Sequence, residues 1–181
     1  MSDRQLIVVD LETTGLDPQA HVPIEVAAIN VATGEALTFV PYLEAMDLGH
    51  ADGEALRINR YFERGVYKLM LNPTSTNEKW IALRNMLDGN TLGGANPRFD
   101  AAMLMRAMGH AGKEPWHHRL ADISAYVAGA RGRTPEELPG LAECCELLGV
   151  INHDPHSALG DAEATVACFH KAAALRAGQV R

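Results

Sequence analysis

The chain begins with an unbroken run of apolar residues that ends in two carboxylates. Residues 6–9 read Leu-Ile-Val-Val, and Asp10, Leu11 and Glu12 follow directly. Four consecutive apolar residues, mostly β-branched, predict a strand buried on both faces. Because side chains alternate along a strand, we expect Asp10 and Glu12 on one face and Leu11 on the other. The rest of the chain is expected to pack around this strand.

The pattern after the first strand predicts a mixed α/β domain. Strands are expected at 23–31 and 36–40, and the turn residues between them (Ala-Thr-Gly-Glu) make this pair an antiparallel hairpin. Residues 41–53 show no regular pattern. Two shorter strands are expected at 91–95 and 120–123, the first rich in small residues that permit close backbone approach. Helical periodicity predicts helices at about 75–87, 97–108, 123–129, 141–148 and 158–175.

Three of these helices carry a recognisable start signal. Ser75 followed three residues later by Glu78 resembles a capping box. Asn96 before Pro97 predicts an N-cap followed by proline at the first helical position. Ser157 is a candidate cap for the last helix.

A basic pattern lies between the second hairpin strand and the first long helix. Residues 54–67 show mixed helical periodicity, and Arg57, Arg60, Arg64 and Lys68 are three or four residues apart. On a continuous helix they would form one basic stripe. Such a stripe fits a solvated helix face, or a surface that binds the phosphates of a nucleic-acid backbone.

Length and charge limit the range of functions. The 181 residues fit one domain, 1–181, with a full hydrophobic core. The formal charge of −7, from 16 Lys and Arg against 23 Asp and Glu, argues against a protein that coats nucleic acid over a broad surface. A small footprint on nucleic acid stays compatible with this charge.

The termini and the cysteines indicate a cytoplasmic setting. The first residues lead straight into the first strand, so we expect no signal peptide, and no apolar run approaches a membrane span. Cys144, Cys145 and Cys168 are odd in number and have neither disulfide nor zinc spacing.

The carboxylates of the first strand predict a metal site. Two acids a few ångströms apart repel each other, and a bound cation removes this penalty. Asp100 and Asp161 are each expected in the first turn of a helix, and His156 lies five residues before Asp161. Oxygen ligands from several elements favour Mg²⁺ or Mn²⁺ over zinc, and a nearby imidazole suits a general base. Two such ions are the recurrent arrangement for phosphodiester cleavage.

Three segments resemble the motifs of a known family. They are 10–15 (Asp-Leu-Glu-Thr-Thr-Gly), 96–100 (Asn-Pro-Arg-Phe-Asp) and 156–161 (His-Ser-Ala-Leu-Gly-Asp). In order and spacing they resemble the DEDDh (DnaQ-like) 3′→5′ exonucleases of the ribonuclease H-like superfamily, which include proofreading epsilon subunits, ribonuclease T and oligoribonuclease. The spacing from His156 to Asp161 matches the histidine branch rather than the tyrosine branch. The resemblance implies a five-stranded mixed sheet, with its first three strands antiparallel, flanked by helices.

The resemblance also implies a role for each residue of the site. Asp10 would bridge two metal ions, Glu12 and Asp161 would complete the site of the ion that holds the attacking water, and Asp100 would hold the second ion. His156 would accept the proton from that water, so that hydrolysis releases a nucleoside 5′-monophosphate. A plain surface histidine is the alternative for His156.

The resemblance implies a substrate pocket next to the metal site. The backbone of 13–15 would contact the terminal sugar, Leu16 would pack against the terminal base, and Phe99 would shape the pocket. Asn96 borders this pocket, and we expect it to cap its helix rather than to bind metal. The implied substrate-binding residues are Thr13, Thr14, Gly15, Leu16, Asn96 and Phe99.

The sequence leaves several functions open. The first is a 3′→5′ exonuclease that acts on single-stranded DNA or RNA ends, and DNA and RNA are not distinguished. A second is a scavenger of short RNA similar to oligoribonuclease. A third is a non-catalytic module that binds nucleic acid or protein, although such modules usually lack one of the acids and none is missing here. The chain ends soon after its last helix, which disfavours a polymerase-binding extension; polymerase association and a homodimer both stay open.

Overall fold

The computed structural model describes residues 4–109 and 112–176. A short helix, α1 (Ala45–Gly49), lies in the segment 41–53 for which the sequence predicted no regular structure. None of the helices in these ranges combines the length and hydropathy of a bilayer span. The elements are β1 (Leu6–Thr13), β2 (Pro23–Asn30), β3 (Ala36–Phe39), α1 (Ala45–Gly49), α2 (Gly53–Ile58), the 3₁₀ helix η1 (Val66–Leu69), α3 (Pro73–Leu87), β4 (Thr91–Gly94), α4 (Pro97–Ala107), β5 (Ala121–Asp122), α5 (Ile123–Ala130), α6 (Leu141–Leu148) and α7 (Ala158–Arg176).

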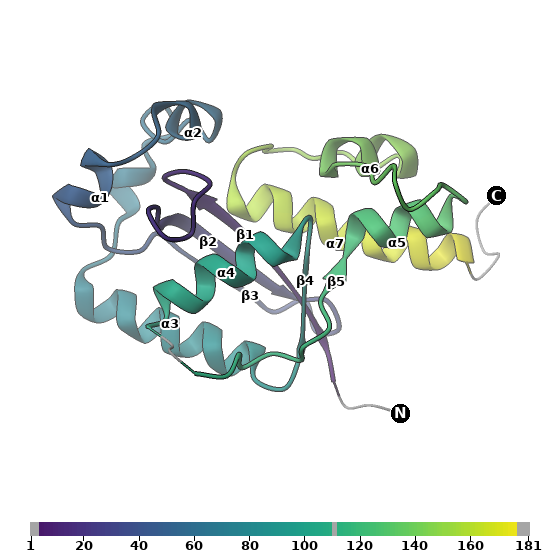
Figure 1. Ribbon diagram of the computed structural model, residues 1–181, viewed down its shortest axis with the longest axis horizontal. Helices are drawn as coiled ribbons and strands as arrows, with labels where there is room; N and C mark the ends of the chain where they lie inside the picture. The colour runs from purple at the N-terminus through teal and green to yellow at the C-terminus, as the bar shows by residue number, and fades with distance from the viewer. Residues whose placement is uncertain (1–3, 110–111, 177–181) are drawn as a thin grey trace.

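The five strands form one mixed sheet in the order β3-β2-β1-β4-β5 (Figure 1). β1 pairs with β2, and β2 with β3, in antiparallel register. β4 runs parallel to β1 and β5 runs parallel to β4. The predicted hairpin and the predicted five-stranded mixed sheet are therefore confirmed, and β1 is the central strand.

Helices cover both faces of the sheet. α5, α6 and α7 group on one side and α3 and α4 on the other (Figure 1). Val8 packs in the core under α5–α7, whereas Ile7, Val9 and Leu11 pack in the core under α3 and α4. This alternation confirms that Asp10 and Glu12 share one face, and the structure shows that α7 covers it.

The short strand β4 depends on its two glycines. A Cβ atom on Gly94 would lie 2.8 Å from the backbone oxygen of Val9, and one on Gly93 would lie 3.0 Å from the backbone oxygen of Ala121. The predicted close backbone approach is therefore present on both sides of β4. The β1–β4 pairing ends at Val8 opposite Gly93, so the last residues of β1 extend beyond β4.

The predicted basic stripe is wrong, because the helix that should carry it is short. α2 ends at Ile58, and Arg60 has a left-handed backbone with φ of 53°. The arginines then point to separate partners instead of forming one row: Arg57 pairs with Glu54, Arg60 with Glu63 and Arg64 with Glu25.

Two of the three predicted caps differ from the sequence interpretation. α3 is capped by Asn72, whose side chain accepts a hydrogen bond from the Ser75 N–H at 2.9 Å, so Ser75 lies inside the helix. Asn96 stands at the predicted N-cap position but has φ of 60°, and its side chain makes no capping hydrogen bond. The cap at Ser157 is confirmed, because its Oγ accepts from the Gly160 N–H at 3.0 Å.

Candidate active site

The end of β1 and its partner strand place three carboxylates on one face of the sheet. In the β1–β2 register Asp10 is opposite Ala27 and Glu12 is opposite Glu25. Side chains of directly opposed residues point to the same face of an antiparallel pair. The small side chain of Ala27 leaves space beside Asp10, and Glu25 adds a carboxylate next to Glu12.

The beginning of α7 brings a fourth acid and an imidazole to this face. One ligand atom from each of Glu12, His156 and Asp161 lies within 4.8 Å of the other two. Asp161 is in the first turn of α7, and His156 lies just before the helix. Residues that are almost 150 positions apart in the sequence thus form a group that could hold a divalent cation.

Asp100 reaches the site from the opposite side of β1. It is buried in the first turn of α4, and its carboxylate accepts a hydrogen bond from the backbone N–H of Leu11. This contact is available because β4 does not pair with β1 beyond Val8. Asp100 and Asp161 both raise the pKa of Asp10, so both carboxylates lie close enough to repel its charge.

Burial and mutual repulsion make these carboxyl groups weak acids. Burial raises the pKa of Glu12 to about 8, with a further increase from Asp161 and Glu25 and an opposing effect from Arg64. Burial likewise raises the pKa of Asp100 to about 8, although the N–H groups of Asp100 and Leu11 act in the other direction. The pKa of Asp10 is raised well above its ordinary value, first by burial and then by the surrounding acids.

This charge distribution fits a divalent metal ion. Ionised carboxylates that are crowded and partly desolvated need a compensating cation. Their oxygens are the donors that Mg²⁺ and Mn²⁺ prefer. Of the predicted residues, Glu12, His156 and Asp161 bring ligand atoms within 4.8 Å of one another and could hold such an ion. Asp10 and Asp100 are not members of this group, although Asp100, Asp161 and Glu12 all raise the pKa of Asp10.

Asp161 is held in place by two neighbours from its own segment. Asn152 donates from Nδ2 to Oδ1 of Asp161 at 2.5 Å. Burial raises the pKa of Asp161, whereas the hydrogen bond from Asn152, the charge of His156 and the backbone N–H of His156 lower it. The carboxylate is therefore oriented by the loop that also carries the imidazole.

His156 is exposed and has an unusual backbone. Its φ is 61°, in the left-handed region that non-glycine residues rarely adopt. The turn into α7 has no space for a side chain at Gly160, where a Cβ atom would collide with the backbone oxygen of Asp154. A surface cavity of about 470 Å³ adjoins the imidazole; its lining residues are Arg57, Ile58, Arg60, Glu63 and His156.

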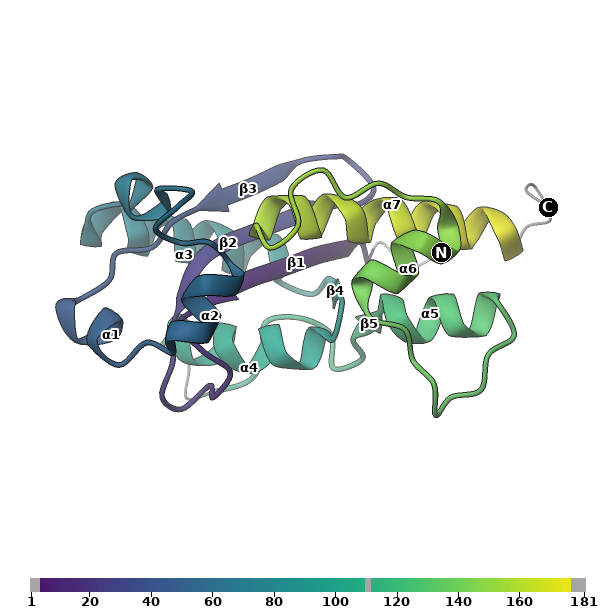
Figure 2. The same cartoon turned by 90° about the horizontal axis from the view of Figure 1, so that it is seen from above.

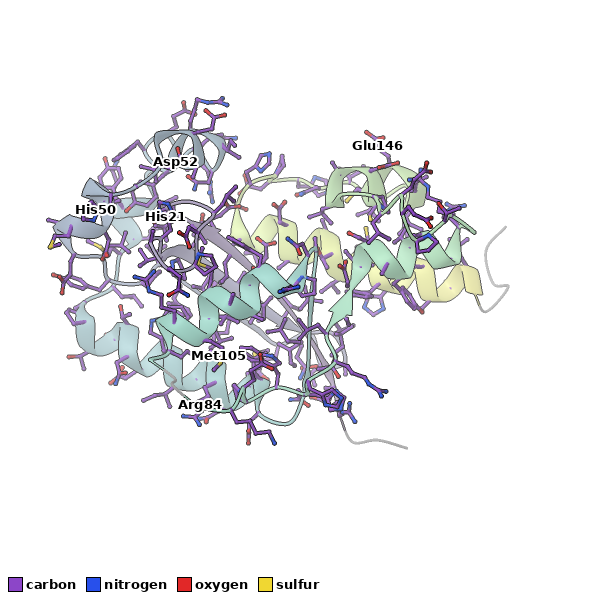
Figure 3. The ribbon with its side chains drawn as sticks, viewed as in Figure 1. His21, His50, Asp52, Arg84, Met105 and Glu146 are labelled. Carbon is purple, nitrogen blue, oxygen red and sulfur yellow. The ribbon has the colours of Figure 1, made fainter. Side chains whose placement is uncertain are left out.

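The loop after β1 is fixed by contacts to distant residues. The backbone oxygen of Thr14 accepts from the Asp52 N–H at 2.7 Å, and the Thr14 hydroxyl lies 3.3 Å from Nδ1 of His21. His21 packs against Gly15 so closely that a Cβ atom there would lie 2.5 Å from its ring. Figure 3 labels His21 and Asp52 at the same end of the molecule. Leu16 projects from this rigid loop with 79% of its surface exposed.

The remaining predicted substrate residues lie around the same end of the sheet. The Thr13 side chain is buried and donates from its hydroxyl to the backbone oxygen of Gly15 at 2.8 Å. Asn96 is exposed at the start of α4. Phe99 is half-buried on α4 and packs against the core shared with α3.

Three residues near the site were missed by the sequence analysis. Glu25 has a detectable signal, because it is the single charged residue in the otherwise apolar strand 23–29. Asn152 lies in a polar loop whose pattern gives no indication of its partner. Arg64 belongs to the predicted basic stripe, and its contact with Glu25 across 39 residues has no local signature.

Comparison with known proteins identifies the family of the chain. The sequence model of the exonuclease family of the ribonuclease T type matches residues 7–169. The oligoribonuclease of Vibrio campbellii is 27% identical over 159 residues, which cover 78% of this chain and 83% of the relative. The oligoribonuclease of Vibrio parahaemolyticus has the same identity and coverage.

Solved structures of exonuclease I share the fold. The E. coli exonuclease I complex with single-stranded DNA, in a zinc-bound form, superposes with a TM-score of 0.70 at 19% identity. A moderately thermophilic exonuclease I from Methylocaldum szegediense has a TM-score of 0.70 at 22% identity. The superpositions cover 98% and 97% of this chain but 42% and 41% of the exonuclease I chains, so the chain spans less than half of their length. The matching family model confirms the prediction made from the three motifs: the chain belongs to the exonuclease family, the 3′→5′ hydrolases of phosphodiester bonds.

Proposed function

We propose that the protein removes nucleotides one at a time from the 3′ end of single-stranded DNA or RNA and releases nucleoside 5′-monophosphates. The observation that carries this proposal is the group formed by Glu12, His156 and Asp161, whose ligand atoms lie within 4.8 Å of one another. Asp10 and Asp100 adjoin this group. The exonuclease family model, which spans the same residues, supports the assignment.

Two ions of Mg²⁺ or Mn²⁺ fit the donor set best. Asp10, Glu12, Asp100 and Asp161 would hold these ions. When bound, divalent ions of this kind lower the pKa of water and neutralise charge that develops on a phosphate. Support comes from the chemistry of the donors, which are carboxylate oxygens on several elements without a thiolate among them.

The chain's own residues would orient the water and move its proton. His156 would accept the proton from the attacking water, whose oxygen forms the new bond to phosphorus while the bond from phosphorus to the 3′ oxygen of the preceding nucleotide breaks. The exposed position of His156 leaves its ring accessible to water and substrate. Asn152 would keep the Asp161 carboxylate turned toward the site.

The terminal nucleotide would bind at the loop after β1. Leu16 would pack against the terminal base, because its apolar side chain is 79% exposed on a loop that is otherwise fixed. The backbone of Thr13, Thr14 and Gly15 would border the sugar. Asn96 and Phe99, at the start of α4, would shape the opposite side of this pocket.

The length of strand that the protein engages is expected to be short. A net charge of −7 provides little phosphate neutralisation outside the site, so binding should depend weakly on salt. A second candidate function, the degradation of short RNA, is favoured by the similarity to oligoribonuclease, which extends over most of both chains.

Digestion of end-labelled strands tests this function. We would incubate 5′-labelled single-stranded DNA and RNA of several lengths with Mg²⁺ or Mn²⁺, with the Asp10→Ala variant as control. The proposal predicts a ladder that shortens from the 3′ end with the wild type and no ladder with the variant. Digestion restricted to the shortest RNAs would favour the scavenger function. The absence of a ladder with every substrate and both metals would favour a non-catalytic binding module and contradict the proposal.

A further inference from the structure

Arg64 is a largely buried cation beside the candidate active site. Its side chain is 15% exposed, and it lies between α2 and η1. Nη1 and Nη2 bind the two carboxylate oxygens of Glu25 at 2.7 and 2.9 Å. Because Glu25 is directly opposite Glu12 in the sheet, this bidentate ion pair fixes Arg64 next to the metal-binding face.

The same guanidinium holds the loop that carries His156. Nη1 of Arg64 donates to the backbone oxygen of His156 at 3.1 Å, across 92 residues of sequence. It also donates to the backbone oxygen of Asn59 at 3.1 Å, and Nη2 lies 3.9 Å from the carboxylate of Asp154. Figure 2 shows α2 close to the beginning of α7, at the end of the sheet where β1 finishes.

The loop that carries His156 contains a strained residue and is contacted from outside by Arg64. His156 has the left-handed backbone described above, which carries a strain of about 1–2 kcal/mol for a residue with a Cβ atom. The other hydrogen bonds that the described residues show for this loop stay within 152–161. The Asp154 N–H donates to Oδ1 of Asn152, and the N–H and hydroxyl of Ser157 donate to the backbone oxygen of Asp154. Arg64 therefore links the loop to the sheet and to the α2 region.

We propose that Arg64 is a positioning residue that sets the His156 imidazole relative to Glu12 and Asp161, by binding the His156 carbonyl while the paired Glu25 fixes the guanidinium. This inference rests on the proposed exonuclease function. Displacement of a reacting group by about 1 Å can lower a rate by about 100-fold. Lysine is a poor replacement, because its ammonium group cannot reproduce the planar guanidinium that binds a carboxylate and two backbone carbonyls.

A direct contact between Arg64 and a substrate phosphate is the competing role. The geometry disfavours it, because Nη1 and Nη2 already bind the Glu25 carboxylate and the backbone oxygens of Asn59 and His156. Nη2 also lies 3.9 Å from the carboxylate of Asp154. Arg57 and Arg60 are far more accessible, with side chains 70% and 50% exposed. A phosphate ligand for Arg64 would have to displace a bidentate carboxylate.

Kinetics of Arg64 variants separate these roles. We expect Arg64→Ala to lower kcat by about 10- to 100-fold with KM changed less than about 3-fold, and Arg64→Lys to recover a small part of the loss. Arg133→Ala is the matched control, because it also removes an arginine from a 2.7 Å ion pair, with Glu143, but lies away from the site. An unchanged kcat in Arg64→Ala, or a raised KM alone, would overturn the proposal.

Hydrogen exchange gives a readout that does not depend on activity. In Arg64→Ala the amides of 154–160 should exchange at least several-fold faster than in the wild type, whereas the amides of α3 should not change. Unchanged exchange in the loop would contradict the positioning role of Arg64. This result does not depend on whether the wild type digests nucleic acid, so the failure of this proposal can be distinguished from the failure of the proposed exonuclease function. Arg64→Lys serves for both measurements if Arg64→Ala does not fold.

A double variant tests whether Arg64 acts through charge alone. Arg64→Ala leaves Glu25 without its cation, next to Glu12, and this charge could itself disturb the metal ligands. Adding Glu25→Gln removes that charge but does not restore the bond to His156. We expect the double variant to stay about as slow as Arg64→Ala, and recovery to the wild-type rate would show that the role of Arg64 is neutralisation of Glu25.

Discussion

Replacing Glu12 with glutamine should stabilise the metal-free protein at pH 8. Burial raises the pKa of Glu12 from 4.5 to about 8. The folded state then binds the proton more tightly than the unfolded state does, so the contribution of this group to stability is fully present below pH 4.5 and is lost as the pH rises toward 8. The glutamine side chain does not ionise, and its shape is nearly the same as that of glutamate.

The size of the effect follows from the pKa shift. At about 1.4 kcal/mol per pH unit, the full shift corresponds to about 5 kcal/mol. Water reaches the half-buried Glu12 side chain and screens its charge, so we expect about 1–3 kcal/mol at pH 8. For a domain of this length that is a rise in Tm of about 2–4 °C for each kcal/mol.

Denaturant unfolding in EDTA, at pH 5 and pH 8, measures this effect. The wild type should be less stable at pH 8 than Glu12→Gln, and the two should converge at pH 5. Saturating Mn²⁺ should raise the stability of the wild type at pH 8 and raise that of the variant much less. Glu78→Gln, an exposed carboxylate on α3, should change nothing. If Glu12→Gln is no more stable than the wild type at pH 8 without metal, the proposed crowding of charge at this site is refuted.

Three further substitutions test the loops around the site. Gly15→Ala should raise KM about 10-fold because the new Cβ would meet the His21 ring, and adding His21→Ala should reverse most of this rise in steady-state kinetics. Gly160→Ala should lower kcat at least 10-fold and destabilise the fold by about 1–3 kcal/mol in thermal unfolding, because the new Cβ collides with the Asp154 backbone. A kcat equal to that of the wild type would contradict the proposed position of the His156 loop. Leu16→Ala should leave Tm within about 1 °C and raise KM, because the exposed side chain stabilises nothing in the free protein; an unchanged KM would remove Leu16 from the substrate pocket.

The sequence predicted the parts of the fold that are set by local pattern. The apolar run of β1, the turn of the β2–β3 hairpin and the helical periods of α4 and α7 each lie within one short segment. The alternation of Asp10, Leu11 and Glu12 also follows from strand geometry alone. The three motifs then implied which distant acids would meet.

Features that depend on long-range contacts could not be read from the sequence. The arginines of 57–64 have a helical spacing, but each has a carboxylate within reach, and the chain turns at Arg60 instead of continuing the helix. Arg64 is bound by a strand residue and a loop carbonyl that lie 39 and 92 positions away. Local spacing cannot distinguish such partners from solvent.

Anomalous diffraction from crystals grown with Mn²⁺ tests the central claim most directly. We expect manganese peaks at the end of β1, bound by the carboxylates of Asp10, Glu12, Asp100 and Asp161, and no peak there in Asp10→Asn. Well-ordered crystals at saturating Mn²⁺ that show no peak at these acids, or manganese bound elsewhere on the molecule, would contradict the account.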